Sequence, residues 1–440
     1  MATLKEGDRA PAPPRALVRA RPLLVVVTVA AVALAVKSFV VDPLTGHFGG
    51  TFEDFQAYLG AARSMAAGGS PYAQFNPSTV VMSGFIYPPF AAVVVRPLAL
   101  LGDRAAADLW LFLSMACAVA GAIVVARTAL PRSWPATELG VLAALAFGPA
   151  TYNYWHGQVN PMILLLLGVA FWAYVRDRQL TVGVLLGFAA AVKVAPVIFL
   201  ILLIRRRWWR ASGAMLATGI LTGGIAIAAV GVGPCVTFIT RVFPDLNRAT
   251  GWIYNQSIGG AVSRLADQSV LRVQPTSVPV QAAGVAAALV VLGLAAWATR
   301  AGTRTPQERA AEFGMWTTVM LLAGGIAWYP HFVHLIIPLF AVLGLAAGGG
   351  WRAERPVVLA AAAALVAFGV VAPVAISYLS IQGIGALSGT GAWWPFLQLC
   401  SLPCLSAVWL AGALAWRLGR DRIPADAPDH AGRHALRATA

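Results

Sequence analysis

Two adjacent carboxylates are the first candidates for chemistry in this chain. Glu53 and Asp54 open the stretch "EDFQAYLGAARSM", which follows an apolar run that begins at Leu23. A carboxylate in this position can act as a general base that takes a proton from an attacking hydroxyl group. It can equally cap a helix N-terminus, where the helix dipole favours negative charge. The residue types alone leave both interpretations open.

Basic side chains in apolar surroundings form a second group of candidates. Lys193 lies near the middle of "TVGVLLGFAAAVKVAPVIFLILL", where a charge is costly and indicates a functional or paired site. His331 and His334 lie in "WYPHFVHLIIP". Lysine and histidine at a membrane surface can bind an anionic lipid headgroup, a phosphate or a sugar. The alternatives are snorkelling of the lysine and an ordinary interfacial position for the histidines.

Polar and aromatic residues in two further segments complete the candidates. Gln158, in "YNYWHGQVNPM", either hydrogen-bonds between helices or lines a cavity. The region 241–272 carries four arginines, among them Arg264, and a guanidinium fork suits phosphate. Trp252 and Tyr254 offer flat faces on which a sugar can stack. Solvated surface charge is the alternative for any single arginine of this region.

The elements that position these groups are predicted to be membrane helices. Hydrophobic residues make up 59% of the 440 residues and charged residues only 11%, against about 25% in a soluble domain. The sequence therefore predicts an all-α polytopic membrane protein. The formal net charge of +15 comes largely from arginines at the ends of apolar runs, which argues against a nucleic-acid partner. Neither a DxD motif nor a metal-type cluster of Cys and His occurs, so no metal or other cofactor is expected.

Apolar runs near the roughly 20 residues needed to cross a bilayer recur along the chain. They predict a membrane domain at 22–416 between an N-terminal segment at 1–21 and a disordered polar tail at 417–440. The short runs at 139–150 and 160–175 leave the topology of 139–175 open. The predicted spans, about twelve in all, lie at 22–41, 86–101, 106–126, 139–150, 160–175, 180–204, 212–232, 279–299, 312–329, 333–349, 357–377 and 397–416.

The distribution of positive charge predicts the orientation. An even number of spans places both termini on one side of the membrane. With cytoplasmic termini, 20 lysines and arginines fall inside and nine outside, the latter including Arg127, Arg132, Arg176 and Arg178. This asymmetry follows the positive-inside rule. The sequence thus predicts a multi-pass plasma-membrane protein with outer loops at about 42–85, 233–278 and 378–396.

The first outer loop is predicted to contain an amphipathic helix. Phe52, Phe55, Leu59 and Ala62 recur at helical spacing. We expect a helix that lies at the membrane interface with its aromatic residues toward lipid. Asp54 then lies near the start of this helix, at the outer membrane surface.

Several motifs occur in an order that resembles a known enzyme family. The Asp-Phe pair after the first helix is followed by "GGSPY" and "FIYPPFAAVVVRPLALLG". Later come "HGQVN", "GFAAAVKVAPVIFLILLIRRRWWR", "NQSIGGAVSRL" and "WYPHFVHLIIP". In this order they resemble the actinobacterial GT-C glycosyltransferases of family 87, the polyprenol-phosphate-mannose-dependent α-1,2-mannosyltransferases. The resemblance covers most of the chain, at about residues 50–340.

The resemblance implies a GT-C membrane fold with its active site at the outer face. The implied donor is polyprenyl-phosphate mannose, and the implied acceptor is a mannosylated glycolipid such as a phosphatidylinositol mannoside or a lipomannan. A β-linked donor that gives an α-linked product requires inversion, and hence one base for the acceptor hydroxyl. The lipid phosphate leaves already ionised, so cations rather than a general acid assist its departure.

The family's functional residues carry over onto matching positions. Its catalytic aspartate corresponds to Asp54, and its histidine ahead of the tenth span corresponds to His331, although Pro330 replaces the first histidine of the family's pair. The family also has a lysine in the helix that corresponds to the predicted span at 180–204, and this lysine matches Lys193. Asn255, Gln256 and Ser257 match the family's "NQS". The predicted substrate-binding set is Glu53, His331, Lys193, Asn255, Gln256, Arg264, Trp252, Tyr254, His334 and Gln158.

Two other functions are compatible with parts of this pattern. The same fold can use polyprenyl-phosphate arabinofuranose as donor, because related enzymes transfer that sugar. A secondary transporter would show pseudo-symmetric halves and acids near the membrane midplane. The acids of this chain instead fall in loops or at helix ends, and no half-repeat is evident. The sequence therefore favours the glycosyltransferase.

Overall fold

The computed structural model describes residues 15–46, 50, 52–76, 84–266, 276–299, 305–382 and 399–420. In these ranges the regular elements are helices, apart from one isolated β-bridge between Asn255 and Trp328. The predicted all-α polytopic class is confirmed. Most of the predicted loop at 378–396 and most of the predicted tail lie outside the described residues. The segments long and apolar enough to cross a membrane are Ala20–Leu44, Asp103–Ala129, Trp209–Val230, Val278–Ala298, Tyr329–Gly349, Arg355–Ser377 and Leu402–Arg420.

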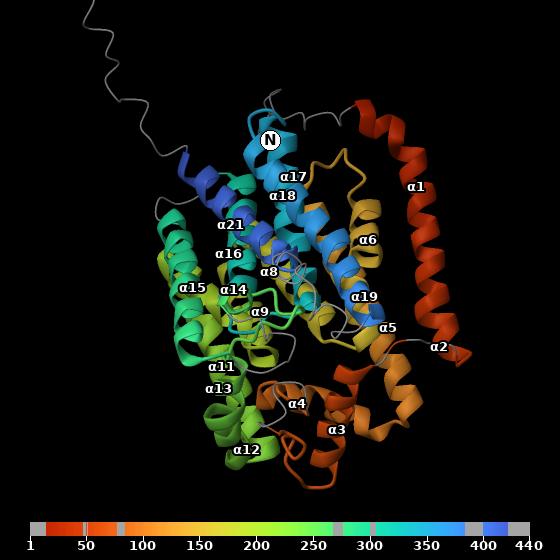
Figure 1. The fold of residues 1–440 in the computed structure, drawn as a ribbon, viewed down its shortest axis with the longest axis vertical. Helices are drawn as coiled ribbons and strands as arrows, with labels where there is room; N and C mark the ends of the chain where they lie inside the picture. The colour runs from red at the N-terminus through yellow and green to blue at the C-terminus, as the bar shows by residue number, and fades with distance from the viewer. Residues whose placement is uncertain are drawn as a thin grey trace, which may run out of the picture.

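The helices form a bundle with two distinct ends (Figure 1). Short helices gather at one end, among them α3 (Glu53–Ala66), α4 (Pro89–Val95) and α12 (Val232–Thr237); we call this the site end. The start of α1 (Arg15–Val36) and the close of α21 (Leu402–Arg420) lie at the opposite end, the termini end. The first and the last described helices thus have these outer ends at the same end of the bundle, and the side of the membrane on which the termini lie stays a prediction.

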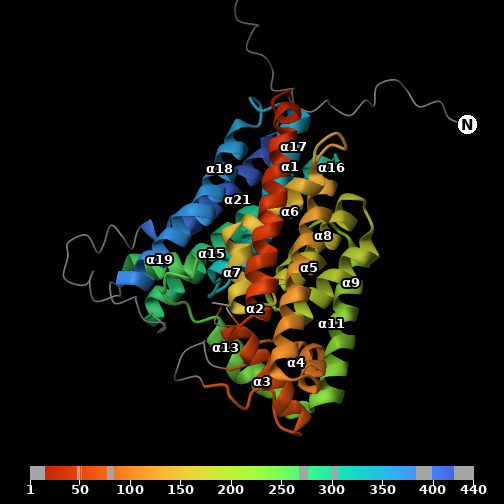
Figure 2. The same cartoon turned by 90° about the vertical axis from the view of Figure 1, so that its right-hand side faces the viewer.

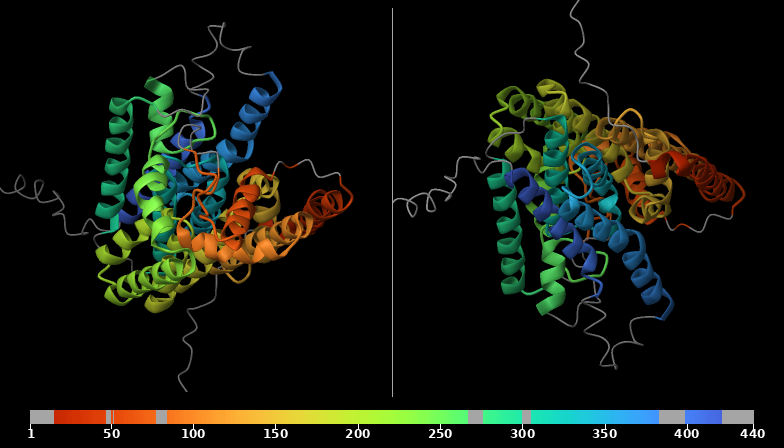
Figure 3. Two further views of the ribbon diagram at one scale, coloured as in Figure 1. Left: turned by 90° about the horizontal axis from the view of Figure 1, so that it is seen from below. Right: turned by 90° about the horizontal axis from the view of Figure 1, so that it is seen from above.

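The first long helix stands at the edge of the bundle. α1 packs against α6 (Ala136–Ala146). It lies in front of the other helices when the bundle is seen from this side (Figure 2), and at the rim when the bundle is seen from either end (Figure 3). Its lower end continues through the π segment η1 (Lys37–Val41) into α2 (Asp42–Leu44). Many apolar side chains of α1 are exposed, which is expected of a helix that faces lipid.

The predicted span at 86–101 does not cross the bundle. α4 and the 3-10 segment η3 (Arg96–Leu100) pack against α3 and lead directly into α5 (Asp103–Ala129). Tyr87, before α4, hydrogen-bonds with Tyr58 of α3, and Asp103, after η3, forms an ion pair with Arg63 of α3. Both ends of the stretch therefore lie at the site end. Prolines divide the stretch into pieces too short to span, so this prediction is wrong.

The predicted span at 180–204 is a hairpin of two legs. α9 (Gln179–Val192) ends at Lys193, whose backbone is extended (φ −144°, ψ 120°), and η4 (Ala195–Ile198) and α10 (Phe199–Arg205) follow. Lys193 contacts Asn160 at the start of α8 (Asn160–Val175), whereas Arg206 contacts Tyr174 at the other end of α8. The chain therefore reaches the site end at Lys193 and turns back.

Because the stretches at 86–101 and 180–204 do not cross the bundle, each loop between residues 102 and 178 lies at the end opposite to the one predicted. Arg104 hydrogen-bonds to the carbonyl of Pro43 in α2 and lies at the site end. α5 then ends at the termini end, where Ala129 meets Gly344 of α17 (Ile336–Gly349). The cations that the sequence placed outside at positions 127, 132, 176 and 178 thus lie at the termini end. Among the described residues, four cations thus move to the termini end and Arg104 moves to the site end, which sharpens the charge asymmetry between the two ends.

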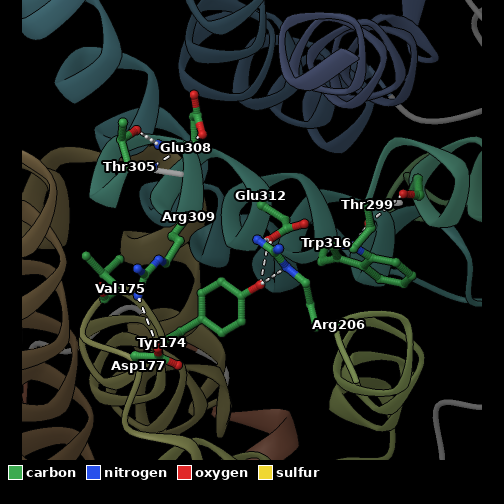
Figure 4. Close-up of polar contacts among 11 residues, drawn as sticks. Tyr174, Val175, Asp177, Arg206, Thr299, Thr305, Glu308, Arg309, Glu312 and Trp316 are labelled. Atoms are coloured by element: carbon green, nitrogen blue, oxygen red, sulfur yellow. Dashed lines mark hydrogen bonds and ion pairs between the residues drawn. The ribbon is translucent and has the colours of Figure 1, made fainter. Parts of the chain in front are cut away.

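A buried ion cluster ties three helical segments together near the termini end (Figure 4). Arg206 donates through Nε and Nη2 to Oε2 of Glu312, at 2.8 and 2.6 Å, and the hydroxyl of Tyr174 donates to the same oxygen at 2.5 Å. Glu312 belongs to α16 (Pro306–Leu322) and is fully buried. The cluster fixes the ends of α8, α10 and α16 that lie away from the site end.

The amphipathic helix predicted in the first outer loop is α3, but its apolar face does not point toward lipid. Phe52, Phe55, Leu59 and Ala62 are all buried, with at most 8% of each residue exposed. Phe55 packs against Trp110 of α5, at a ring-centroid distance of 5.9 Å. The predicted orientation is wrong because Trp110 of α5 offers this face an aromatic surface within the protein.

Candidate functional site

Asp54 lies in the first turn of α3, beside a strained residue. Phe52, which precedes the helix, adopts the left-handed conformation (φ 51°, ψ 27°) and donates its backbone N–H to the carbonyl of Trp155 at 3.2 Å. A left-handed backbone in a bulky residue costs about 1–3 kcal/mol and persists only where the surroundings impose it. The strain therefore fixes the direction in which α3 starts and in which Asp54 points.

The turn between α7 (Gly148–His156) and α8 supports the start of α3. Gly157 has a φ of +68°, and a Cβ atom built on it would lie 2.6 Å from the Cβ of Phe55. Its carbonyl accepts a hydrogen bond of 2.7 Å from the indole N–H of Trp110. Only glycine combines this positive φ with so close an approach to Phe55. The following residue, Gln158, is 4% exposed and hydrogen-bonds to the carboxylate of Asp54.

Lys193 and His331 meet at the site end although 138 residues separate them. Nζ of Lys193 lies 3.0 Å from Nε2 of His331 and donates to Oδ1 of Asn160 at 2.7 Å. His331 lies in the 3-10 segment η7 (Tyr329–Leu335), which precedes α17. The helix break at Lys193 and the 3-10 turn at His331 bring a lysine and an imidazole together where no continuous helix would.

Side-chain amides and a tyrosine connect Asp54 with this pair. Oε1 of Gln158 lies 3.3 Å from the hydroxyl of Tyr87 and 3.3 Å from Nδ2 of Asn160. Asn160, in turn, accepts from Lys193. A continuous set of hydrogen bonds therefore runs from the carboxylate to the amine.

Burial raises the pKa of Asp54 to about 6. The desolvation of its carboxylate is the largest cause, and Glu53 raises the pKa further through like-charge repulsion. The hydrogen bond from Gln158 and the charge of Lys193 act in the opposite direction. A carboxylate with a pKa near 6 is ionised at neutral pH and holds a proton more readily than an ordinary aspartate does. These are the properties required of a general base.

An aromatic row borders the carboxylates. The rings of Trp252 and Tyr254 stack at 5.7 Å, Tyr254 lies 5.7 Å from Tyr152, and Tyr152 stacks on His156 at 4.1 Å. Tyr152 is within electrostatic range of Asp54 and Glu53. The row presents partly exposed rings beside the candidate base, an arrangement suited to the apolar face of a sugar.

The "NQS" segment holds the chain that carries His331. The side chain of Asn255 donates to the carbonyls of Thr250 and Gly325, at 2.9 and 3.1 Å, and the backbone N–H of Gln256 donates to the carbonyl of Ala327 at 2.8 Å. The amide group of Gln256 donates to the carbonyl of Cys400, just before α21, at 2.9 Å and accepts from the backbone N–H of Cys404 in α21 at 3.2 Å. Both side chains are buried. These contacts anchor the segment at 325–329 immediately before η7.

Arg264, on α14 (Ile258–Ala266), is fully buried behind this segment. Its guanidinium donates to Oγ of Ser401 at 2.8 Å and to the carbonyls of Asn255 and Trp252 at 2.8 and 3.1 Å. The structure therefore places Asn255, Gln256 and Arg264 together as a support, apart from the hydrogen bonds that join Asp54 to Lys193. Their role in substrate binding stays a prediction.

Glu53 and His334 occupy contrasting positions. Glu53 is exposed at the first position of α3. His334 is 1% exposed and lies on the same 3-10 segment as His331. Contact of either residue with substrate stays a prediction.

The sequence did not single out Tyr58, Tyr87 or Tyr152 for the site. Tyr87 occurs in the quoted "FIYPPF" and Tyr152 in "YNYWHGQVNPM", so each lies within a motif, but nothing in the local pattern shows that it contacts a residue far along the chain. Tyr58 donates its hydroxyl hydrogen to the hydroxyl of Tyr87 at 2.8 Å, and both are buried. In the described ranges, His, Cys, Asp and Glu form no group of three or more that could hold a metal ion.

The bundle and this cluster are typical of a membrane-embedded enzyme that combines a carboxylate base with a site for an anionic group. Residues 85–325, more than half of the chain, match Glycosyltransferase family 87. The chain therefore belongs to glycosyltransferase family 87.

Curated relatives support this assignment. A polyprenol-phosphate-mannose-dependent alpha-(1-2)-phosphatidylinositol pentamannoside mannosyltransferase of Mycobacterium tuberculosis (strain CDC 1551 / Oshkosh) is 29% identical over 66% of this chain and 65% of its own length. The protein of the same name from Mycolicibacterium smegmatis is 29% identical over 69% of this chain and 75% of its own length. The chain thus matches just under two thirds of the first relative. A crystal structure of ArnT from Cupriavidus metallidurans bound to undecaprenyl phosphate aligns with a TM-score of 0.42 and 13% identity, over 91% of this chain and 79% of that chain.

Proposed function

We propose that the protein transfers mannose from polyprenyl-phosphate mannose to a hydroxyl group of a mannosylated glycolipid, a phosphatidylinositol mannoside or a lipomannan, in an α-1,2 linkage. The observation that carries this proposal is the hydrogen-bonded connection between the Asp54 carboxylate and the Lys193–His331 pair. The names of the curated relatives support the donor and the acceptor. The site end would face the outside of the plasma membrane, with both termini in the cytoplasm.

The proposed reaction is a single displacement with inversion. The acceptor oxygen forms a bond to C1 of the mannose while the bond from C1 to the phosphate oxygen breaks. The hydroxyl proton passes to the carboxylate of Asp54, and the electron pair of the broken bond leaves with the lipid phosphate. Lys193 and His331 stabilise the charge that develops on this phosphate, so the reaction needs neither a general acid nor a metal.

The test is transfer by the purified protein in detergent, with polyprenyl-phosphate mannose and a mannosylated phosphatidylinositol. We expect Asp54→Asn to reduce the rate by at least about 10³-fold, because a general base contributes roughly 10²–10⁴-fold. Asp245→Asn, on α13 (Phe243–Leu246), is the matched control, because this aspartate pairs with Arg248 and lies outside the hydrogen bonds that join Asp54 to Lys193. Product formed from polyprenyl-phosphate arabinofuranose, but not from the mannose donor, would contradict the proposed sugar. Retained activity of Asp54→Asn would contradict the proposed base.

A further inference from the structure

Three side-chain amides separate the candidate base from the cationic pair. Asn153 lies on α7, Gln158 in the turn that follows, and Asn160 at the start of α8, and each is at most 4% exposed. Asn153 donates to the carbonyls of Pro149 and Pro330, at 2.6 and 2.8 Å, which ties this group to the segment of His331. The amides therefore contact both halves of the proposed site.

The hydrogen-bond partners determine which way each amide points. Lys193 can only donate, so it requires the oxygen of Asn160, at 2.7 Å. Nδ2 of Asn160 then donates to Oδ1 of Asn153 at 2.9 Å and lies 3.3 Å from Oε1 of Gln158. With its oxygen facing Asn160, Gln158 presents its NH₂ group to the carboxylate of Asp54. One orientation satisfies the whole set, and the cation at one end imposes it.

Tyrosine hydroxyl groups reinforce this orientation. The hydroxyl of Tyr87 donates to Oε1 of Gln158 at 3.3 Å and itself accepts from Tyr58 at 2.8 Å. Two donors therefore hold the oxygen of Gln158 away from Asp54. A flipped Gln158 would direct its oxygen at a carboxylate and its NH₂ group at these donors, and would lose all three interactions.

We propose that Gln158 and Asn160 are positioning residues that form an amide relay from Lys193 to Asp54, and that the relay fixes the carboxylate in the orientation required for taking the acceptor proton. This inference rests on the proposed function and replaces direct substrate contact by Gln158 with action through Asp54. Asn160 acts one step further away, because it touches Gln158 and Lys193 rather than the carboxylate.

The relay predicts a pH dependence that a merely structural role would not produce. The groups that face Asp54 are Glu53 on its own helix, Lys193 after α9, Tyr58 on α3, Tyr87 before α4 and Tyr152 on α7. Two contributions lower the pKa of Asp54: the charge of Lys193 and the hydrogen bond from Gln158. Removal of the relay therefore leaves the carboxylate less stabilised, and the acidic limb of the rate profile must move to higher pH.

The experiment measures kcat/KM against pH for wild type, Gln158→Met and Asn160→Leu, together with the infrared C=O band of the protonated Asp54 carboxyl, which needs no activity. In the wild type the acidic limb is expected near pH 6. Gln158→Met should move the limb and the infrared titration upward by about one pH unit, as expected for a lost hydrogen bond to the charged form. Asn160→Leu should move both in the same direction but by less, because Asn160 reaches the carboxylate only through Gln158. kcat should fall while KM changes less than about threefold. Asn247→Leu on the outer surface, whose amide donates to the carbonyl of Phe243, is the control and should leave both unchanged.

The outcomes separate the relay from the proposed function. A raised KM with an unmoved limb in Gln158→Met would overturn the relay and return Gln158 to substrate binding. An unmoved limb and infrared titration in Asn160→Leu would also overturn it. If Asn160→Leu does not fold, Asn160→Ser retains a hydroxyl acceptor for Lys193 and must give a smaller shift in the same direction. Loss of the wild-type limb itself, or activity in Asp54→Asn, would instead contradict the proposed base.

Discussion

Gly157 and Phe55 approach each other so closely that a methyl group on Gly157 would come within 2.6 Å of the Phe55 Cβ atom. This contact joins the turn that carries Gln158 to the helix that carries Asp54. It explains why a glycine separates His156 from Gln158 in "HGQVN". Backbone packing therefore sets the distance between Asp54 and Gln158 independently of the hydrogen bonds of the site.

Gly157→Ala tests this packing. The change places a Cβ at a positive φ, which costs about 1–2 kcal/mol, and forces α3 from the turn, which adds roughly 1–3 kcal/mol. We expect a lower Tm in detergent and a loss of transfer activity of at least about tenfold. Gly293→Ala on α15 (Val278–Ala298) is the control, since no atom lies within 4 Å of its added methyl group. Equal effects of the two substitutions would contradict the packing argument.

The raised pKa of Asp54 predicts a trade between stability and activity. The carboxyl has a pKa of about 6 in the fold and 3.8 in the unfolded chain. The folded state thus binds more protons between these values, and its free energy of unfolding falls as the pH rises from about 4 to about 6. Above that range the ionised group destabilises the fold by about 3 kcal/mol.

Asp54→Asn removes this charge. We expect the inactive variant to have a higher Tm than wild type at about pH 8, and a difference that shrinks toward about pH 4, where wild-type Asp54 is protonated in the fold. Thermal unfolding in detergent at several pH values measures this. A Tm difference that is independent of pH would show that Asp54 does not titrate in this range.

The buried cluster of Arg206, Glu312 and Tyr174 predicts a large and non-additive effect on stability. Arg206→Met leaves the carboxylate of Glu312 buried without its cation, which is expected to cost about 3–5 kcal/mol. The double variant Arg206→Met/Glu312→Gln should regain part of this loss, because the orphaned charge is gone. Arg248→Ala, which removes an exposed partner of Asp245, should change stability by less than about 1 kcal/mol. A simple sum of the single effects would contradict the coupling.

Arg264 and Ser401 test whether the buried guanidinium is a support. Arg264→Met leaves carbonyl groups of the "NQS" segment without a donor, and we expect a loss of about 2–4 kcal/mol. Ser401→Ala removes the hydrogen bond that Ser401 accepts from Arg264 and should cost about 1 kcal/mol. The affinity for the polyprenyl-phosphate sugar, measured well below the Tm, should change little in both variants. A tenfold weaker affinity in Arg264→Met alone would assign this arginine to substrate binding, as the sequence predicts.

The sequence located the candidate site because its residues are exceptional in their surroundings. Lys193 interrupts an apolar run, and Asp54 begins a short helix after a long span, so both are visible in the local pattern. The path of the chain through the bundle was harder to predict from the sequence. Hydropathy does not distinguish a straight helix from a hairpin that turns at Lys193, nor a spanning segment from α4 and η3.

The partners of the site residues depend on long-range contacts. Lys193 meets Asn160 across 33 residues and His331 across 138, and no local spacing encodes such distances. The burial of the α3 aromatic face had the same cause, because Trp110 belongs to another helix. The roles of the site residues in substrate binding and catalysis remain predictions for the experiments above.

The packing of α9 on α8 also bears on how the protein is inserted into the membrane. A lysine that enters the bilayer costs about 2.5–3.5 kcal/mol on scales measured at the translocon. Asn160 is synthesised before Lys193 and accepts its hydrogen bond from within the same helical pair. The nascent chain can therefore shelter this cation as soon as α9 leaves the ribosome, long before the segment of His331 has been made.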